Sequence, residues 1–373
     1  MTVAASGLTH PPAGAYALFK EIRRFGSLNG WRAIAILGVI WHHTMAHSLA
    51  SPMAQQGKHG VTLFFVISGF LIVTLLLRER ERTDAISLGK FWGRRCLRIL
   101  PVYYAALLIY IVLVGLLDHS VSGRDFFHNL PFFATFTSNL FVTPGDRTIF
   151  VFSWSVAAEE QFYLTWPLVE CLVRRRLHKM LILGAMIIVS RSIIFISGSL
   201  WTDDVLPLGI MLGTMLAHLL HEPGSFRLVS AVLGRRGSAF ASLALAVTVL
   251  AVAPYLGLIG ELLIPIAFMP LIGACVIRED NDLARLLQSQ PLEWIGVVSY
   301  GMYMLHMLSV NIARGACSVL GLHAPILDFA GGAMIAVGIA SVSWIVFERP
   351  LLRLKSRLFS TVPQSAAGRP AVA

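Results

Sequence analysis

The stretch 28–47 of this sequence is apolar, yet it contains side chains that can move protons or bind anions. Arg32 and His43 lie eleven residues apart in it, with His42 directly before His43 and His47 four residues after it. In an α-helix, 3.6 residues per turn would place Arg32 and His43 on one face, roughly 16 Å apart along the axis. Imidazole acts as a general base near neutral pH, so His43 is a candidate catalytic residue. The alternative is that Arg32 reaches to the inner membrane interface and the histidines belong to the outer one.

A second apolar stretch, 150–173, contains two adjacent carboxylates, Glu159 and Glu160. At the membrane depth of His43, a carboxylate would orient the imidazole and stabilise its protonated form. The same side chains also fit a hydrogen-bonded network that only fixes helix packing, for instance with Arg191.

Arg95 and Arg98 form an i, i+3 pair in the basic connector 78–98. If this stretch is helical, both side chains face one side. Guanidinium groups bind phosphate in bidentate fashion, so a phosphate-rich donor molecule is an attractive ligand. A topology signal or a contact with lipid headgroups explains the pair equally well.

The elements that must position these residues follow from composition. Of the 373 residues, 56% are hydrophobic and 13% are charged, about half the charged fraction of a soluble domain. About 20 apolar residues form one membrane span. The sequence therefore predicts an all-α fold, a polytopic transmembrane helical bundle of about ten spans. The predicted spans are 28–47, 60–77, 100–117, 150–173, 180–197, 205–220, 239–256, 262–277, 294–320 and 326–347.

Basic residues gather in alternate connectors, which predicts the orientation of the bundle. The basic connectors are 78–98, 174–179, 227–236, 278–285 and 349–357. The positive-inside rule makes these connectors and both termini cytoplasmic. The net charge of +10 is thus attributed to topology, and no nucleic acid partner is expected. The less basic connector 118–147 contains six phenylalanines, and part of it is expected to rest in the outer interface or to re-enter the protein.

Three regions are expected along the chain. Residues 1–26 are predicted to be a flexible cytoplasmic N-terminal segment without a removable signal peptide, 27–358 the integral membrane domain, and 359–373 a disordered C-terminal tail. The four cysteines, Cys96, Cys171, Cys275 and Cys317, are scattered singly. Neither a disulfide framework nor a metal site is expected from them.

Taken in order, these motifs resemble the acyltransferase-3 family of membrane acyltransferases. The stretch from Arg32 to His43 is similar to its Arg, ten residues, His signature, and Arg95 to Arg98 to its RxxR motif. Further similar segments are Phe-Phe-x-Ile-Ser-Gly-Phe at 64–70, Trp-Ser with Glu-Gln-Phe-Tyr at 154–163, Ser-Tyr-x-x-Tyr-x-x-His at 299–306 and Glu-Arg-Pro at 348–350. The resemblance runs from about 27 to 354. Asn29 and Ala157 depart from it, since many members have Asp and Ser there.

The resemblance implies a membrane O-acyltransferase with ten spans in the bacterial inner membrane. It implies transfer of a short acyl group, commonly acetyl, from cytoplasmic acyl-coenzyme A to a hydroxyl of a carbohydrate. The implied acceptors are surface polysaccharide, lipopolysaccharide and lipo-oligosaccharide. Expected partners are thus acyl-coenzyme A as donor substrate, a carbohydrate or glycolipid acceptor and membrane lipids, with no permanently bound cofactor.

The candidate site residues fall into three groups. The catalytic group is His43, Glu159 and Glu160; the donor-binding group is Arg32, Arg95 and Arg98; the substrate-binding group is Ser68, Trp154, Ser155, Tyr163, Tyr303 and His306. Direct transfer and an acyl-histidine intermediate both remain open. Two other classes of function fit the composition: a proton-coupled secondary transporter of an anionic or sugar-like solute, and a non-catalytic lipid-binding component.

Overall fold

The computed structural model describes residues 14–45, 52–118, 120–142, 148–197, 205–322 and 324–358. Within these ranges the chain is helical and contains no strand, which confirms the all-α class. The helices are α1 (Ala15–Glu21), α2 (Gly26–Met45), α3 (Pro52–Gln55), η1 (Gln56–His59), α4 (Gly60–Thr83), α5 (Leu88–Leu117), α6 (Val121–Ala134), α7 (Ser138–Phe141), α8 (Ser153–Leu172), α9 (Arg176–Ser197), α11 (Leu208–Leu220), α12 (Pro223–Leu233), α13 (Ser238–Leu256), α14 (Leu258–Ile277), α15 (Ala284–Leu287), α16 (Gln290–Val319), α17 (Pro325–Ser343), η2 (Trp344–Glu348) and α18 (Arg349–Leu358).

Each predicted span coincides with a helix. Seven helical stretches are long and apolar enough to cross a membrane, and they contain α4, α5, α9, α13, α14, α16 and α17. The three other predicted spans correspond to α11, which has 13 residues, and to α2 and α8, which carry the polar residues singled out above. The number of ten spans and the orientation of the termini therefore stay predictions.

Close helix packing depends on glycine at several interfaces, two of which show the principle. Helix α2 packs between α4 and α16. At Gly296 of α16, a Cβ atom would lie 2.0 Å from the backbone oxygen of Asn29 in α2. At Gly213 of α11, it would lie 2.1 Å from the backbone oxygen of Val66 in α4. Since only glycine fits there, these backbones approach as small residues allow in membrane bundles.

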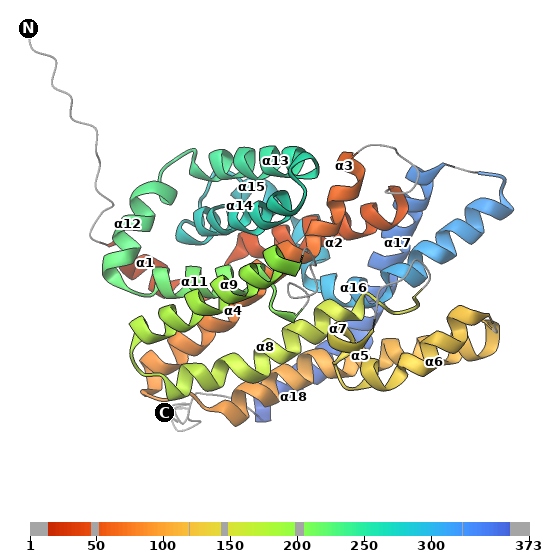
Figure 1. Ribbon diagram of the computed structural model, residues 1–373, viewed down its shortest axis with the longest axis horizontal. Helices are drawn as coiled ribbons and strands as arrows, with labels where there is room; N and C mark the ends of the chain where they lie inside the picture. Colours follow the sequence, from red (N-terminus) through yellow and green to blue (C-terminus); the bar gives the residue numbers. More distant parts are fainter. Residues whose placement is uncertain are drawn as a thin grey trace, which may run out of the picture.

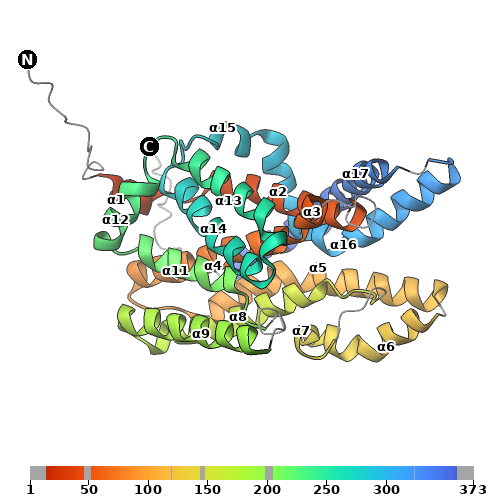
Figure 2. The same cartoon turned by 45° about the horizontal axis from the view of Figure 1, so that its top comes forward.

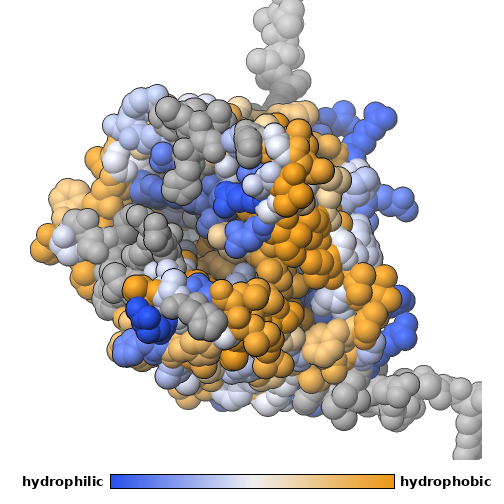
Figure 3. Space-filling model, turned by 90° about the vertical axis from the view of Figure 1, so that its right-hand side faces the viewer, coloured by the Kyte–Doolittle hydropathy of each residue, from blue (hydrophilic) through white to orange (hydrophobic). Residues whose placement is uncertain are grey.

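The helices form an elongated bundle that ends in two arms. Helices α4, α5 and α8 run along its length, and α12 and α1 lie at the left-hand end (Figure 1). At the right-hand end, α16 with α17 and α5 with α6 project as separate arms (Figure 2). Figure 3 looks onto this end and shows a hollow with apolar side chains along one side of its rim. Large apolar side chains also remain exposed along α9 and α13, as a lipid-facing surface requires: Leu181, Ile188, Phe195, Phe240 and Leu245.

Helix α6 folds back along α5. The hydroxyl of Tyr103 donates to the carbonyl of Phe133 over 2.7 Å, and that of Tyr104 to the carbonyl of Ala134 over 2.8 Å. Tyr103 stands 14 residues before Leu117, the last residue of α5, which is about 21 Å at 1.5 Å per residue. The phenylalanine-rich connector therefore packs against α5, while its two expected arrangements, in the outer interface or re-entering the protein, stay predictions.

The N-terminal segment differs from the expected flexible one. Helix α1 is packed against the bundle, with Phe19 fully buried and its ring 5.4 Å from that of Phe226. The guanidinium of Arg78 donates to the carbonyls of Phe19 and Ile22. The segment is short, but this aromatic anchor gives it enough buried apolar surface to order it. Residues 1–13, the tail 359–373 and His47 lie outside the described residues.

Candidate active site

A cavity of about 510 Å³ lies between α2, α4, α5, α8 and α16. Eight of the predicted site residues line it: Arg32, Ser68, Arg95, Arg98, Ser155, Glu159, Tyr163 and Tyr303. Four others do not line it: His43, Trp154, Glu160 and His306. Trp154 instead packs edge-on against Phe65, with 5.8 Å between ring centroids. The cavity thus brings together residues from five helices that are far apart in the sequence.

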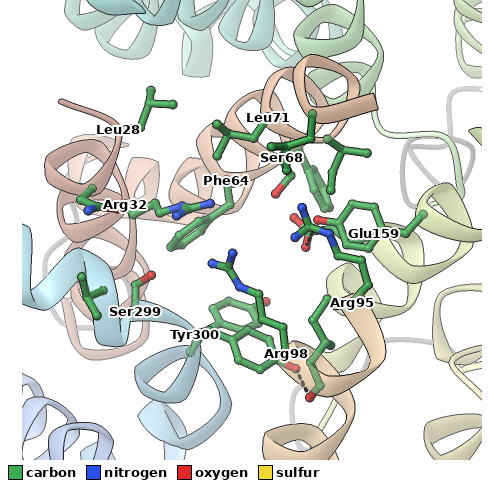
Figure 4. A pocket seen from close by; sticks show the side chains of 18 of the residues that line it. Leu28, Arg32, Phe64, Ser68, Leu71, Arg95, Arg98, Glu159, Ser299 and Tyr300 are labelled. Atoms are coloured by element: carbon green, nitrogen blue, oxygen red, sulfur yellow. Dashed lines mark hydrogen bonds between the residues drawn. The ribbon is translucent and has the colours of Figure 1, made fainter. Parts of the chain in front are cut away.

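Arginines dominate one end of this cavity. The side chains of Arg32 from α2 and Arg98 from α5 point into the same space (Figure 4). The guanidinium of Arg95 lies 5.5 Å from the ring centroid of Tyr163 and 5.8 Å from that of Phe91. Helix α5 begins at Leu88, so both RxxR arginines lie on one continuous helix instead of in a loop. Converging guanidinium groups of this kind suit phosphate oxygens.

The carboxylate of Glu159 lies with the arginines. Its Oε2 accepts a hydrogen bond of 2.9 Å from the hydroxyl of Tyr163. Arg95 and Ser68 both point toward it (Figure 4). His43, in contrast, lies eleven residues beyond Arg32 on α2. The expectation that Glu159 orients the imidazole of His43 is therefore not supported, because the carboxylate serves the arginine end of the cavity.

Glu160 faces away from the cavity. Its Oε1 is buried and has no hydrogen-bond partner within the described part of the chain. Neighbouring residues on a helix point about 100° apart, so only one of two adjacent carboxylates can line the cavity wall. Arg191, the alternative partner for a carboxylate, donates to the carbonyl of Leu206 over 3.2 Å.

The opposite end of the cavity is closed by a serine and a tyrosine. The hydroxyl of Tyr303 donates to the carbonyl of Phe152 over 2.9 Å and shares a hydrogen bond of 2.7 Å with the hydroxyl of Ser155. The ring of Phe152 packs against Tyr303, with centroids 5.9 Å apart. This closed end joins α8 to α16.

Two imidazoles lie next to this closed end. The ring centroid of His306 is 5.1 Å from that of His43, 4.9 Å from that of Phe152 and 5.3 Å from that of Tyr303. His306 is fully buried, and its Nδ1 lies 2.5 Å from the carbonyl oxygen of Tyr303. Because a carbonyl only accepts, this bond assigns the hydrogen to Nδ1 and leaves Nε2 with a free lone pair.

The environment of the Nε2 atom of His306 is unusual for a polar atom. It is buried and has no hydrogen-bond partner among the described residues. An unpaired polar atom in a protein interior costs free energy and needs an explanation. A role as hydrogen-bond acceptor beside His43 supplies one.

A buried ionic cluster fixes the C-terminal half of α8. Glu170 is fully buried, and its carboxylate bonds to Lys179 of α9 over 2.5 Å and to His218 of α11 over 2.9 Å. The indole of Trp166 donates to it over 3.1 Å. Moving these charged groups out of water costs free energy, but once they are paired, loss of one partner would leave an uncompensated buried charge. It holds α8, and with it Ser155 and Glu159, against the neighbouring helices.

Several lining residues were not assigned a role from the sequence. Arg23 and Arg24, from the turn between α1 and α2, and Arg78, from the last part of α4, add positive charge. Tyr300 and Glu348 also line the cavity. Tyr300 and Glu348 belong to segments that resemble family motifs. These motifs indicated that the two residues matter, but the sequence could not predict that their side chains line the cavity.

Sequence comparison identifies the family. The family profile Acyl_transf_3, described as an acyltransferase domain, matches residues 25–346. The chain belongs to the acyltransferase-3 family. The match includes every helix from α2 to α17, and thus most of the cavity lining, the arginine pair and both imidazoles.

Curated relatives of this acyltransferase-3 chain include peptidoglycan O-acetyltransferase OatA of Listeria monocytogenes, 27% identical over 317 residues. The alignment covers 75% of this chain and 48% of OatA. Putative peptidoglycan O-acetyltransferase YrhL of Bacillus subtilis is 30% identical over 327 residues, covering 78% of this chain and 49% of YrhL. A putative O-acetyltransferase of Staphylococcus aureus is 34% identical over 165 residues, 41% of this chain and 26% of its own. The chain spans about half the length of the first two relatives. No solved structure matches it.

Proposed function

We propose that this protein is a membrane O-acyltransferase that moves an acetyl group from acetyl-coenzyme A to a hydroxyl of a bacterial surface carbohydrate. One observation carries the proposal: a cavity with several arginines in its wall is also lined by Tyr303, whose ring packs against the imidazole of His306, and His306 packs against His43. The relatives named as peptidoglycan O-acetyltransferases support a glycan acceptor, and the seven long apolar helices support a membrane location.

The donor would lie along the cavity. Its phosphates would bind to Arg95 and Arg98 with help from Arg32, because guanidinium groups pair with phosphate oxygens. Its pantetheine arm would pass the apolar wall formed by Phe64 and Leu71 toward Ser155. The rise of about 16 Å from Arg32 to His43 is a span that this extended arm can cover.

The chemistry would take place at His43. The imidazole accepts the proton of the acceptor hydroxyl while its oxygen attacks the thioester carbonyl. The carbon–sulfur bond then breaks, and the thiolate of coenzyme A takes up the proton. The Nε2 lone pair of His306 would accept a hydrogen bond from His43, directly or through one water, and stabilise the imidazolium. If His43 carried the acyl group itself, the kinetics would be ping-pong, whereas direct transfer needs both substrates bound together.

The test is transfer of radiolabelled acetyl groups from acetyl-coenzyme A to surface glycan by the purified protein in proteoliposomes. H43A is expected to lose about 100-fold or more of the transfer rate, the range found for general bases. H128A, which alters an exposed histidine of α6 away from the cavity, is the matched control and should transfer normally. A fully active H43A protein would contradict the proposal. So would a wild-type protein that carries a labelled solute across the bilayer without consuming acetyl-coenzyme A.

A further inference from the structure

A second, smaller pocket lies at the far end of α16 from the arginine-rich cavity mouth. It has a volume of about 260 Å³ and is lined by Arg314, Ser318, Leu322, Pro325 and Asp328. All five residues belong to the arm formed by α16 and α17 or to the turn between them. None of them lines the donor cavity. We name this site the outer pocket.

The outer pocket is linked to His43. The guanidinium of Arg314 donates a hydrogen bond of 2.6 Å to the backbone carbonyl of His43. A ligand that contacts Arg314 would therefore be separated from His43, the proposed catalytic residue, only by the guanidinium group of Arg314. His306 lies eight residues earlier on the same helix, about 12 Å toward the donor cavity.

The charges in the outer pocket are balanced. Nε of Arg314 lies 3.5 Å from Oδ2 of Asp328, and both side chains are only partly exposed. An anionic ligand would gain from the guanidinium but would be repelled by the neighbouring carboxylate. A neutral ligand with several hydroxyl groups can donate to Asp328 and accept from Arg314 without either penalty.

The remaining lining residues suit the same class of ligand. Ser318 adds a hydroxyl that both donates and accepts, while Leu322 and Pro325 provide an apolar surface. A sugar ring combines hydroxyl groups at its edge with a C–H face, so it matches this combination. Drug-sized ligands occupy pockets of roughly 300–1,000 Å³, so a pocket slightly below that range fits a single ring.

We infer that the outer pocket is an acceptor subsite that binds one uncharged sugar unit of the glycan, next to the unit whose hydroxyl is acylated at His43. This inference rests on the proposed function. It assigns Arg314, Ser318 and Asp328 to acceptor binding, separate from the donor site. The competing explanation is structural: Arg314 caps the last turn of α2, and Asp328 lies in the first turn of α17, where an acidic residue is favourable.

Two variants separate these explanations. D328N keeps the size of the side chain but removes the carboxylate, and S318F fills the pocket from an exposed position without altering the contact between Arg314 and His43. Each is placed in cells that lack their own copy, and base-labile acetyl groups on the surface glycan are quantified. Binding of acetyl-coenzyme A to the purified variants and their melting temperatures are measured alongside. E279Q, which alters an exposed carboxylate outside both pockets, is the control.

Both variants are expected to lower glycan acetylation about tenfold, with donor affinity and melting temperature within experimental error of the wild type. Wild-type acetylation in both variants would overturn the inference, as would losses that follow a lower melting temperature, since the structural explanation predicts them. Failure of the proposed function looks different: the wild-type protein would then not bind acetyl-coenzyme A, and H43A would leave glycan acetylation unchanged.

Discussion

Replacement of His306 by asparagine tests the pair of imidazoles most directly. The amide nitrogen of asparagine occupies the position of Nδ1, so it retains the hydrogen bond to the carbonyl of Tyr303, which is 2.5 Å long in the native protein. Nothing in H306N replaces Nε2, the buried atom that has no hydrogen-bond partner in the described part of the chain. Glutamine does the reverse, because its terminal amide reaches the position of Nε2. The two substitutions thus separate the anchoring nitrogen from the nitrogen that would act on His43.

The size of the effect follows from the bond that is lost. A hydrogen bond to a charged group contributes about 1.5–3 kcal/mol. At 1.36 kcal/mol for each factor of ten, kcat of H306N should fall by roughly 10- to 150-fold. The KM for acetyl-coenzyme A should stay unchanged, because His306 does not line the donor cavity. H306Q should retain more activity than H306N.

The assay is initial-rate kinetics of acetyl transfer in proteoliposomes, with the melting temperature of each variant measured in parallel. A kcat of H306N within twofold of the wild type would refute the reasoning. Equal losses in H306N and H306Q that follow the melting temperature would show that His306 only fills space.

Two further predictions concern charged groups, Arg98 in the cavity and Glu222 at the start of α12. R98A should raise the KM for acetyl-coenzyme A about tenfold or more and leave kcat unchanged, because a charge-assisted phosphate contact is lost. Acetyl-pantetheine lacks the phosphates, so its KM should be the same for R98A and for the wild type. An equal rise in the KM for acetyl-pantetheine would exclude phosphate binding by Arg98. At the start of α12, hydrogen bonds from the backbone of Ser225 and Gly224 lower the pKa of Glu222 from its ordinary value of 4.5 to about 2. Because the folded-state pKa is the lower one, this contribution to stability is present above about pH 4.5 and is lost as the pH falls toward 2. Thermal unfolding should therefore depend less on pH in this range for E222Q than for the wild type, and identical pH profiles would contradict the assignment.

The sequence could predict helix positions because the membrane imposes a simple rule on them. Apolar runs of about 20 residues have few alternatives in lipid, so even α2 and α8, with their polar side chains, were found as helices. The start of α5 was missed because Leu88 to Leu97 is basic and was assigned to a connector. A helix that continues beyond the lipid has no apolar signal to mark it.

Eight of the twelve candidate residues named from the sequence line the cavity, but the sequence could not give all of their spatial relations. Arg95 and Arg98 could be paired from spacing, since they lie on one helix. The sequence could not predict which of Glu159 and Glu160 lines the cavity, because this depends on how α8 is rotated against α4 and α5. Likewise, Glu348 and Arg78 reach the cavity from helices far apart in the sequence, and only tertiary packing brings them there.

The closed end of the cavity has a consequence for the energy supply of the cell. Ser155 and Tyr303 end the cavity on the donor side, and Phe152 packs against both Tyr303 and His306 beyond it. A continuous water path through the bundle would conduct protons and dissipate the proton-motive force. In the proposed function, these side chains would leave the membrane tight to ions and would give way only to an acyl group that arrives as part of a bound substrate.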